Sequence, residues 1–154
     1  MTAGAQTLHV SADTQNVATQ IAVHRSERPA EVQCSNAKVL VVDDDADFRA
    51  LARKILETAD FEVSEAAAAS ECLAHLRSYP TDLVILDIVL PDRDGIEALA
   101  EIRTLFPETK ILTISGAENC ELYLKVSSYL GADASLEKSR ISSLCALLKV
   151  VLDR

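Results

Sequence analysis

The chain alternates between short apolar runs and longer amphipathic stretches. The runs at 38–42, 83–86 and 110–115 are dominated by Val, Leu and Ile, which is typical of strands buried on both faces of a sheet. Residues 61–66 alternate between apolar and polar side chains, as in a half-exposed edge strand. Residues 132–136 indicate a fifth, short strand.

The stretches between these runs carry apolar residues at helical spacing, with charged residues on the other positions. Pro and Gly residues close several of them, as expected at helix ends. The sequence therefore predicts helices near residues 48–57, 67–77, 94–106, 118–129 and 139–152.

Strict alternation of strands and helices with short connections predicts a parallel sheet with right-handed crossovers. An α/β domain of five strands suits the flavodoxin-like, doubly wound sheet with strand order 2-1-3-4-5. In that order the first and third strands are neighbours. Ligands are then expected at the carboxyl ends of these two strands, where the winding of the sheet reverses.

Residues 1–37 differ from the rest of the chain. They are rich in Ala, Thr, Gln and Ser and carry few large apolar groups. We expect a poorly ordered extension with at most a marginal helix near residues 12–24. The folded domain is predicted to span residues 38–154.

The net charge of −9 and the pI of about 4.7 exclude several classes of partner. Nucleic acids and anionic membrane surfaces both require a basic face, so neither is expected to bind. No apolar run is long enough for a signal peptide or a membrane span, and we expect a cytoplasmic protein. No two cysteines form a Cys-x-x-Cys motif, so free thiols are expected at Cys34, Cys72, Cys120 and Cys145.

Carboxylates follow the two strands that should be neighbours. Asp43 and Asp44 end the first strand, and Asp87 ends the third. Three carboxylates in one cleft raise each other's pKa unless a cation neutralises them, and Mg2+ with its oxygen ligands suits such a site. Ser115 and Lys138 follow the fourth and fifth strands and add a hydroxyl and an ammonium at the same edge.

Each of these residues also has a simpler explanation. Asp87 could cap the following helix, Ser115 could form a turn before a glycine, and Lys138 could be an ordinary surface lysine. Asp45 precedes the first helical turn and is predicted to cap it. The simple explanations lose weight because carboxylates, hydroxyl and ammonium all recur at strand carboxyl ends, a set that suits phosphoryl transfer to a carboxylate.

Four motifs give the chain a specific resemblance. They read VVDDD at 41–45, LDIVLPDRDG at 86–95, ISGA at 114–117 and GADASLEK at 131–138. Over residues 38–152 the chain resembles the receiver domain of two-component response regulators. The resemblance implies a signalling module that catalyses only its own phosphorylation and dephosphorylation.

The resemblance also implies roles for the strand-end residues. Asp87 would take a phosphoryl group from the phosphohistidine of a histidine kinase or phosphotransfer protein. Asp44, Asp87 and the carbonyl of Val89 would bind Mg2+ directly, and Asp43 would act through water.

Further roles and two departures follow from the same resemblance. Ser115 and Lys138 would contact the phosphoryl oxygens. Receivers usually carry an aromatic residue where this chain has Ser135, and a proline where it has Ser139. The acceptor chemistry is unaffected by these changes, but a switch based on a rotating aromatic ring is put in question.

Two other functions compete with a phosphorylatable receiver. A phosphatase of the haloacid-dehalogenase kind needs Thr or Val two residues after its Asp-x-Asp motif, and Asp47 stands there instead. A degenerate receiver that only docks or dimerises is the remaining alternative. The chain ends at Arg154, so we expect a stand-alone receiver that signals through a downstream protein partner.

The predicted output surface comprises the helix at 118–129, the fifth strand and the last helix. Both helices carry more apolar residues than one buried face requires, and such excess often marks a partner or homodimer contact. The helix at 118–129 carries two apolar sets at helical spacing, of which only one can face the sheet. The first set is Leu122, Val126 and Tyr129, and the second is Tyr123 and Leu130. On the last helix, Leu147 and Val150 lie outside the predicted core stripe.

Overall fold

The computed structural model describes residues 36–154 apart from residues 117 and 119. The predictions made for residues 1–35, including the helix near 12–24 and the thiol of Cys34, lie outside the described residues. So does Ala117 of the ISGA motif.

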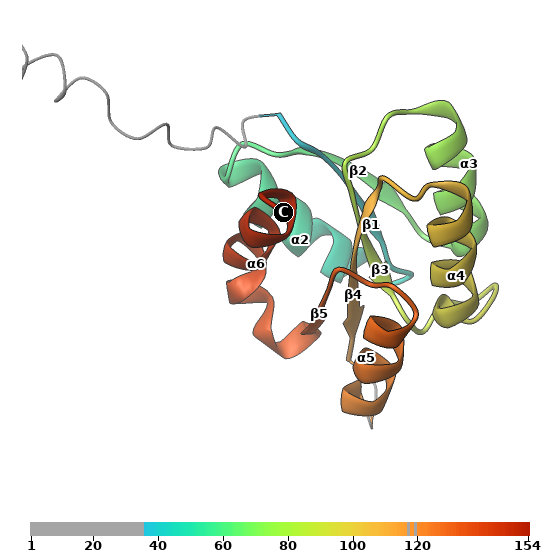
Figure 1. The fold of residues 1–154 in the computed structure, drawn as a ribbon. Helices are drawn as coiled ribbons and strands as arrows, with labels where there is room; N and C mark the ends of the chain where they lie inside the picture. Colours follow the sequence, from blue (N-terminus) through green and yellow to red (C-terminus); the bar gives the residue numbers. More distant parts are fainter. Residues whose placement is uncertain (1–35, 117, 119) are drawn as a thin grey trace, which may run out of the picture. The chain divides into compact units, whose positions relative to one another are not determined.

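A five-stranded parallel sheet forms the centre of the fold, with the order β2-β1-β3-β4-β5 (Figure 1). This confirms the predicted strand order. Buried aliphatic side chains fill the three inner strands, as the apolar runs predicted. The strands are β1 (Lys38–Val42), β2 (Glu62–Ala66), β3 (Leu83–Asp87), β4 (Lys110–Ser115) and β5 (Ala134–Glu137).

The helices connect these strands in the predicted alternation. Asp45 caps the first of them, because its Oδ1 accepts hydrogen bonds from the backbone N–H groups of Asp47 and Phe48. The helices are α2 (Ala46–Thr58), α3 (Ala69–Ser78), α4 (Gly95–Leu105), α5 (Cys120–Tyr129) and α6 (Leu144–Leu152).

The prediction of one continuous helix over 139–152 was wrong. A 3-10 helix, η1 (Lys138–Ser143), comes first, and the backbone leaves helical geometry at Arg140 before α6 begins. Three of the six residues in η1 are serines, whose hydroxyls compete for backbone hydrogen bonds and disfavour a regular α-helix.

Two layers of helices cover the sheet (Figure 1). Alternate strand residues face opposite sides, so Val39 and Val41 pack with α2 and α6, whereas Leu40 and Val42 pack with α3 and α4. The largest fully buried side chains are all Leu or Ile.

α5 contacts the sheet differently from the other helices. Its one buried residue is Ser127, whose Oγ lies 2.7 Å from Thr113 Oγ1 on β4. Ser135 Oγ on β5 lies 3.0 Å from the same Thr113 oxygen, and Ser128 Oγ lies 3.2 Å from Ser135 Oγ. We call Thr113, Ser127, Ser128 and Ser135 the hydroxyl cluster; it includes Ser135, the position at which the resemblance led us to expect an aromatic residue.

The apolar residues of α5 are therefore more exposed than predicted. We expected one of two apolar sets to face the sheet, but both face solvent, because the hydroxyl cluster holds the inner side of the helix. On α6, Leu147 packs against the core, which contradicts its assignment to the exposed set, whereas Val150 is exposed. The exposed large apolar residues of α5 are Leu122, Tyr123, Val126 and Tyr129, and the exposed Leu130 follows directly after the helix.

In the described part of the chain, no helix combines the length and the apolar character needed to cross a membrane.

Candidate functional site

The sheet brings three carboxylates together at the carboxyl ends of β1 and β3. The two strands pair in parallel with Val42 opposite Leu86, so the residues that follow them meet at one edge. Asp43, Asp44 and Asp87 each offer a carboxylate oxygen, and these oxygens all lie within 4.8 Å of one another. Asp43 and Asp87 are buried, while Asp44 is exposed.

Short backbone turns orient the two buried carboxylates. Asp43 Oδ1 accepts a hydrogen bond from the N–H of Asp45 at 2.9 Å, and Asp87 Oδ1 accepts one from the N–H of Val89 at 3.0 Å. Arg49 fixes the same turn from α2 by donating to the carbonyl of Asp43 at 2.7 Å. One oxygen of each carboxylate is thus used locally, and both Oδ2 atoms lie beside the ammonium of Lys138.

Lys138 reaches both of these Oδ2 atoms from the start of η1. Its Nζ lies 2.6 Å from Asp43 Oδ2 and 2.7 Å from Asp87 Oδ2. The same ammonium lies over the ring of Phe48, 4.7 Å from the centroid, in a cation–π contact. Gly116 leaves room for the lysine stem, since an added Cβ there would meet Lys138 Cδ at 3.3 Å.

The pKa values in this cluster reflect burial and charge pairing. Burial raises the pKa of Asp43, although the hydrogen bond with Lys138 acts in the opposite direction. Burial by itself would lower the pKa of Lys138, but its hydrogen bonds to Asp43 and Asp87 outweigh this and raise the pKa. Lys138 is therefore a charged partner of the carboxylates at neutral pH.

The donor set fits Mg2+. Asp43 Oδ2 is buried and lies 2.6 Å from the Lys138 ammonium. The other donors are carboxylate oxygens beside a cavity of about 420 Å³. Hard oxygen donors beside an open volume are what Mg2+ prefers, because it keeps several waters. Asp44, Asp87, Val89, Leu90, Pro91, Gly116 and Lys138 line this cavity.

The remaining predicted residues lie at the same edge. Ser115 is fully buried at the end of β4, one residue beyond Ile114, which pairs with Asp87. Val89 follows β3 and forms an isolated antiparallel bridge with Asp94. The structure thus brings the three aspartates and the lysine into one cluster and places the serine and valine at its border.

The loop after Asp87 requires glycine at position 95. A Cβ there would lie 2.5 Å from the carbonyl oxygen of Asp87 and 2.5 Å from Ile88 Cα, which is closer than real Cβ contacts allow. The N–H of Gly95 also donates to the carbonyl of Ile88 at 2.9 Å. The backbone of α4 therefore packs directly against Ile88, the residue that follows β3.

Sequence reasoning missed the role of Asp92 in this loop. Its two carboxylate oxygens accept hydrogen bonds from the N–H groups of Ala69 and Ser70, each at 3.0 Å. These hydrogen bonds lower the pKa of Asp92. The sequence contains a single indication: Ala68, just before α3, has no side chain that could cap the helix, so the cap has to come from elsewhere.

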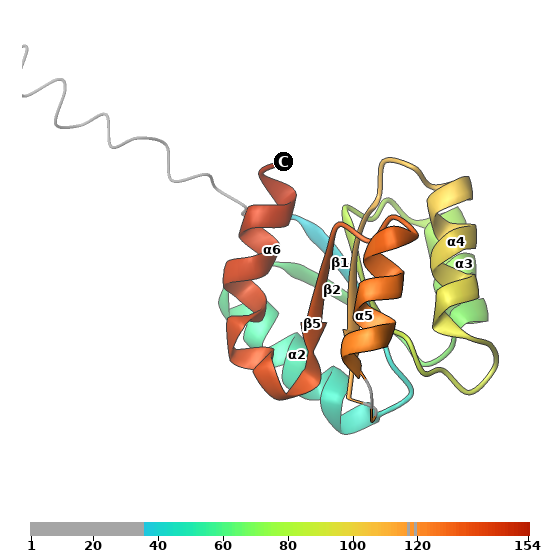
Figure 2. The same cartoon turned by 60° about the horizontal axis from the view of Figure 1, so that its bottom comes forward.

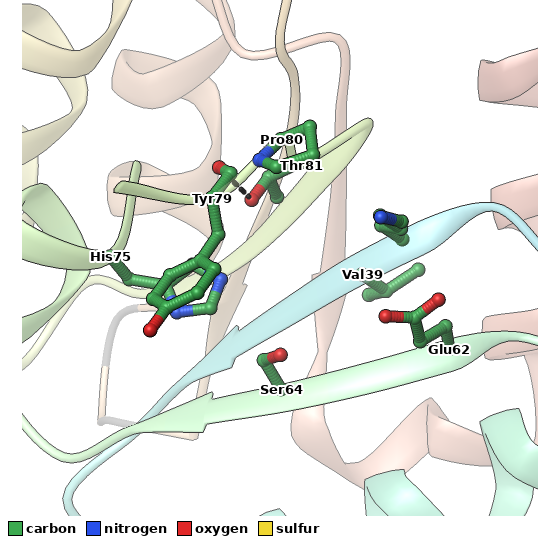
Figure 3. Close-up of a pocket in the computed structure, with 8 residues that line it drawn as sticks. Val39, Glu62, Ser64, His75, Tyr79, Pro80 and Thr81 are labelled. Carbon is green, nitrogen blue, oxygen red and sulfur yellow. Dashed lines mark hydrogen bonds between the residues drawn. The ribbon is translucent and has the colours of Figure 1, made fainter. Parts of the chain in front are cut away.

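A second hollow of about 290 Å³ lies at the opposite ends of the strands. Lys38 and Glu62, the first residues of β1 and β2, help to line it, together with His75 and Tyr79 of the α3 end (Figure 3). The rings of His75 and Tyr79 lie 5.0 Å apart. This hollow contains none of the predicted site residues.

Comparisons with known proteins agree with this geometry. The sequence model of the response regulator receiver domain matches residues 39–149. The chain is similar to the chemotaxis protein CheY of Halobacterium salinarum, at 38% identity over 102 residues, which make up 66% of this chain and 83% of that protein.

The chain is also similar to part of a longer protein, the CAI-1 autoinducer sensor kinase/phosphatase CqsS of Vibrio cholerae. The identity is 34% over 96 residues, which are 62% of this chain but only 14% of CqsS. Among solved structures, the response regulator TrrA of Thermotoga maritima, in complex with Mg(2+)-BeF, aligns with a TM-score of 0.67 and 32% identity. That alignment covers 75% of this chain and 98% of TrrA.

Proposed function

The chain belongs to the response regulator receiver domain family, and from this premise we propose that Asp87 accepts a phosphoryl group in a Mg2+-dependent reaction. The donor is the phosphohistidine of a histidine kinase or phosphotransfer protein. The observation that carries the proposal is the cluster of three carboxylates around one lysine, with oxygens within 4.8 Å of one another.

The chemistry follows from how Asp87 is held. Its carboxylate attacks phosphorus, an O–P bond forms as the P–N bond to the donor imidazole breaks, and the imidazole nitrogen keeps the electron pair. The N–H of Val89 orients the carboxylate by its hydrogen bond to Oδ1. Ser115 and Lys138 lie at the same edge and would contact the oxygens of the transferred group.

Asp44, Asp87 and the carbonyl of Val89 would hold the metal directly, and Asp43 through water. When bound, Mg2+ supplies positive charge that offsets the carboxylates and favours approach of the phosphoryl anion. Supporting this assignment, the solved structure of TrrA holds Mg(2+)-BeF.

The test uses acetyl phosphate as the phosphoryl donor, with intact-mass detection. The wild-type chain should gain one phosphoryl group in Mg2+ and none in EDTA, and Asp87→Asn should gain none. Asp47→Asn is the matched control, because Asp47 is an exposed carboxylate in the first turn of α2, outside the cluster. Equal labelling of Asp87→Asn would contradict the assignment, and no labelling of the wild type would favour a degenerate receiver.

The output surface is proposed to be α5, β5 and α6, with a downstream protein or a second copy of the chain as its partner. β5 lies between α5 and α6 (Figure 2). Tyr129 on α5 is 96% exposed and Val150 on α6 is 50% exposed, and neighbouring exposed apolar residues extend the surface.

Tyr129→Glu and Val150→Glu should weaken self-association or partner binding, because each places a charge on the apolar surface. Val150 is the test position on α6, because Leu147 packs on the core. Sedimentation velocity with and without acetyl phosphate measures the self-association. Glu71→Lys on α3, outside this surface, is the control. Unchanged association and partner binding in both surface variants would exclude α5, β5 and α6 as the output surface.

A further inference from the structure

α3 is capped by a residue from another part of the chain. Its N-cap residue, Ala68, has the extended backbone of a capping position but makes no side-chain hydrogen bond. The first N–H groups of the helix, those of Ala69 and Ser70, are satisfied instead by the two oxygens of Asp92. The loop between β3 and α4 thus supplies the cap that the local sequence lacks.

Asp92 lies in the middle of the loop that begins at the acceptor strand. The start of this loop is fixed by the hydrogen bond from the N–H of Val89 to Asp87 Oδ1. Its end is fixed by Asp94, whose Oδ1 caps α4 through the N–H of Ile96 at 2.8 Å. Between these two points, Asp92 joins the loop to α3.

We infer that Asp92 is a positioning residue of the metal site: by holding the loop to α3, it keeps the Val89 carbonyl directed at the carboxylate cluster. This inference rests on the proposed function, in which the Val89 carbonyl is a ligand of Mg2+. It predicts that Mg2+ affinity depends on a side chain that lies outside the carboxylate cluster. Residues that orient ligands in this way typically change metal affinity by about 10- to 100-fold when they are mutated.

The loss of Asp92 has two effects that must be separated. Asp92→Ala removes the helix cap and the loop contact together, and the missing cap alone costs about 1 kcal/mol. Ala68→Ser can restore a local cap, because serine is a preferred N-cap residue and position 68 already has extended geometry. The double variant Asp92→Ala/Ala68→Ser therefore has a capped helix but an untethered loop.

The experiment measures Mg2+ binding by isothermal titration and thermal unfolding by circular dichroism in EDTA, using full chains. Asp92→Ala should lose about 10-fold in Mg2+ affinity and unfold at a lower temperature. The double variant should regain the unfolding temperature but not the affinity. Ala68→Ser alone should bind Mg2+ as the wild type does.

Two outcomes would contradict the inference that Asp92 positions the loop for metal binding. Mg2+ affinity restored in the double variant would show that Asp92 is only a helix cap, and unchanged affinity in a folded Asp92→Ala would show the same. If Asp92→Ala does not fold, Asp92→Asn keeps one acceptor oxygen and serves in its place, with the same criterion. A wild-type chain that binds no Mg2+ would contradict the proposed function itself, and with it the positioning role of Asp92.

Discussion

Lys138 is the residue on which the electrostatics of the site depend. One ammonium faces two buried carboxylates at 2.6 and 2.7 Å and lies over the ring of Phe48. In this position it partly neutralises the cluster in the absence of metal. The lysine and a divalent cation therefore compete for the same negative charge.

Replacing Lys138 by Met should change stability and metal affinity in opposite directions. Without metal the variant should lose about 3 kcal/mol of unfolding free energy, because two buried carboxylates lose their cationic partner. Its affinity for Mg2+ should rise several-fold, since a competing charge is gone. Urea unfolding in EDTA and isothermal titration with Mg2+ measure the two effects.

Lys125→Met is the matched control, because Lys125 is an exposed lysine on α5. It should change neither the unfolding free energy nor the Mg2+ affinity. A parallel fall of stability and affinity in Lys138→Met would contradict the competition and indicate general damage to the site.

At the scale of elements, the features that the sequence predicted well are those that follow from the pattern of apolar and polar residues over short stretches of chain. The five strands, their order and the edge that carries Asp43 and Asp87 all follow from apolar runs and alternation. Contacts between polar groups far apart in the chain have no such pattern. Arg103 on α4, for example, donates to the carbonyl of Gly131 and to the carboxylate of Asp133, and nothing in its neighbourhood indicates this.

The same reasoning explains the error in α5. Apolar spacing in α5 indicated a buried stripe, but Thr113 and Ser135, on two different strands, offered hydroxyl partners to Ser127 instead. In the candidate site, the carboxylates and Lys138 were predictable from their positions at strand ends. Phe48 and Asp92 were not, because their partners lie on distant elements.

The cap on α3 should make the stability of the protein depend on pH in the acid range. Hydrogen bonds from the N–H groups of Ser70 and Ala69 lower the pKa of Asp92 below its ordinary value of 3.8. The unfolded chain then binds more protons than the folded chain, so this contribution is present above pH 3.8 and is lost as the pH falls through the lowered pKa.

Wild type should therefore exceed Asp92→Asn in stability by up to about 1 kcal/mol near neutral pH, since a charged cap also favours the helix dipole. Urea unfolding at a series of pH values measures the difference between the two chains, which should shrink below pH 3.8. A difference that stays constant down to strongly acid pH would show that the charge of Asp92 does not contribute.

For the whole molecule, two apolar clusters fill the space on both faces of the sheet within the described residues. The N–H of Asn36 donates to the carbonyl of Asp60 at the start of the domain. The family match, at 39–149, covers nearly the same range. These observations support a domain that does not need the preceding residues.

A chain shortened to begin at Ser35 should therefore fold and accept phosphoryl as the full chain does. Its unfolding free energy should lie within about 0.5 kcal/mol of the full-length value, as for changes away from packed features. Urea unfolding and acetyl phosphate labelling compare the two chains. Loss of folding or labelling would show that residues 1–34 contact the domain.

The hydroxyl cluster beneath α5 has a consequence for local unfolding. Helices held by aliphatic packing, such as α2 and α6, expose apolar surface when they detach, and urea favours that exposure. Most of the large apolar side chains of α5 already face solvent, and its one buried residue, Ser127, makes directional hydroxyl contacts with the sheet. Detachment of α5 should therefore depend only weakly on urea, and its amide hydrogens should exchange at a rate nearly independent of denaturant while those of the sheet do not.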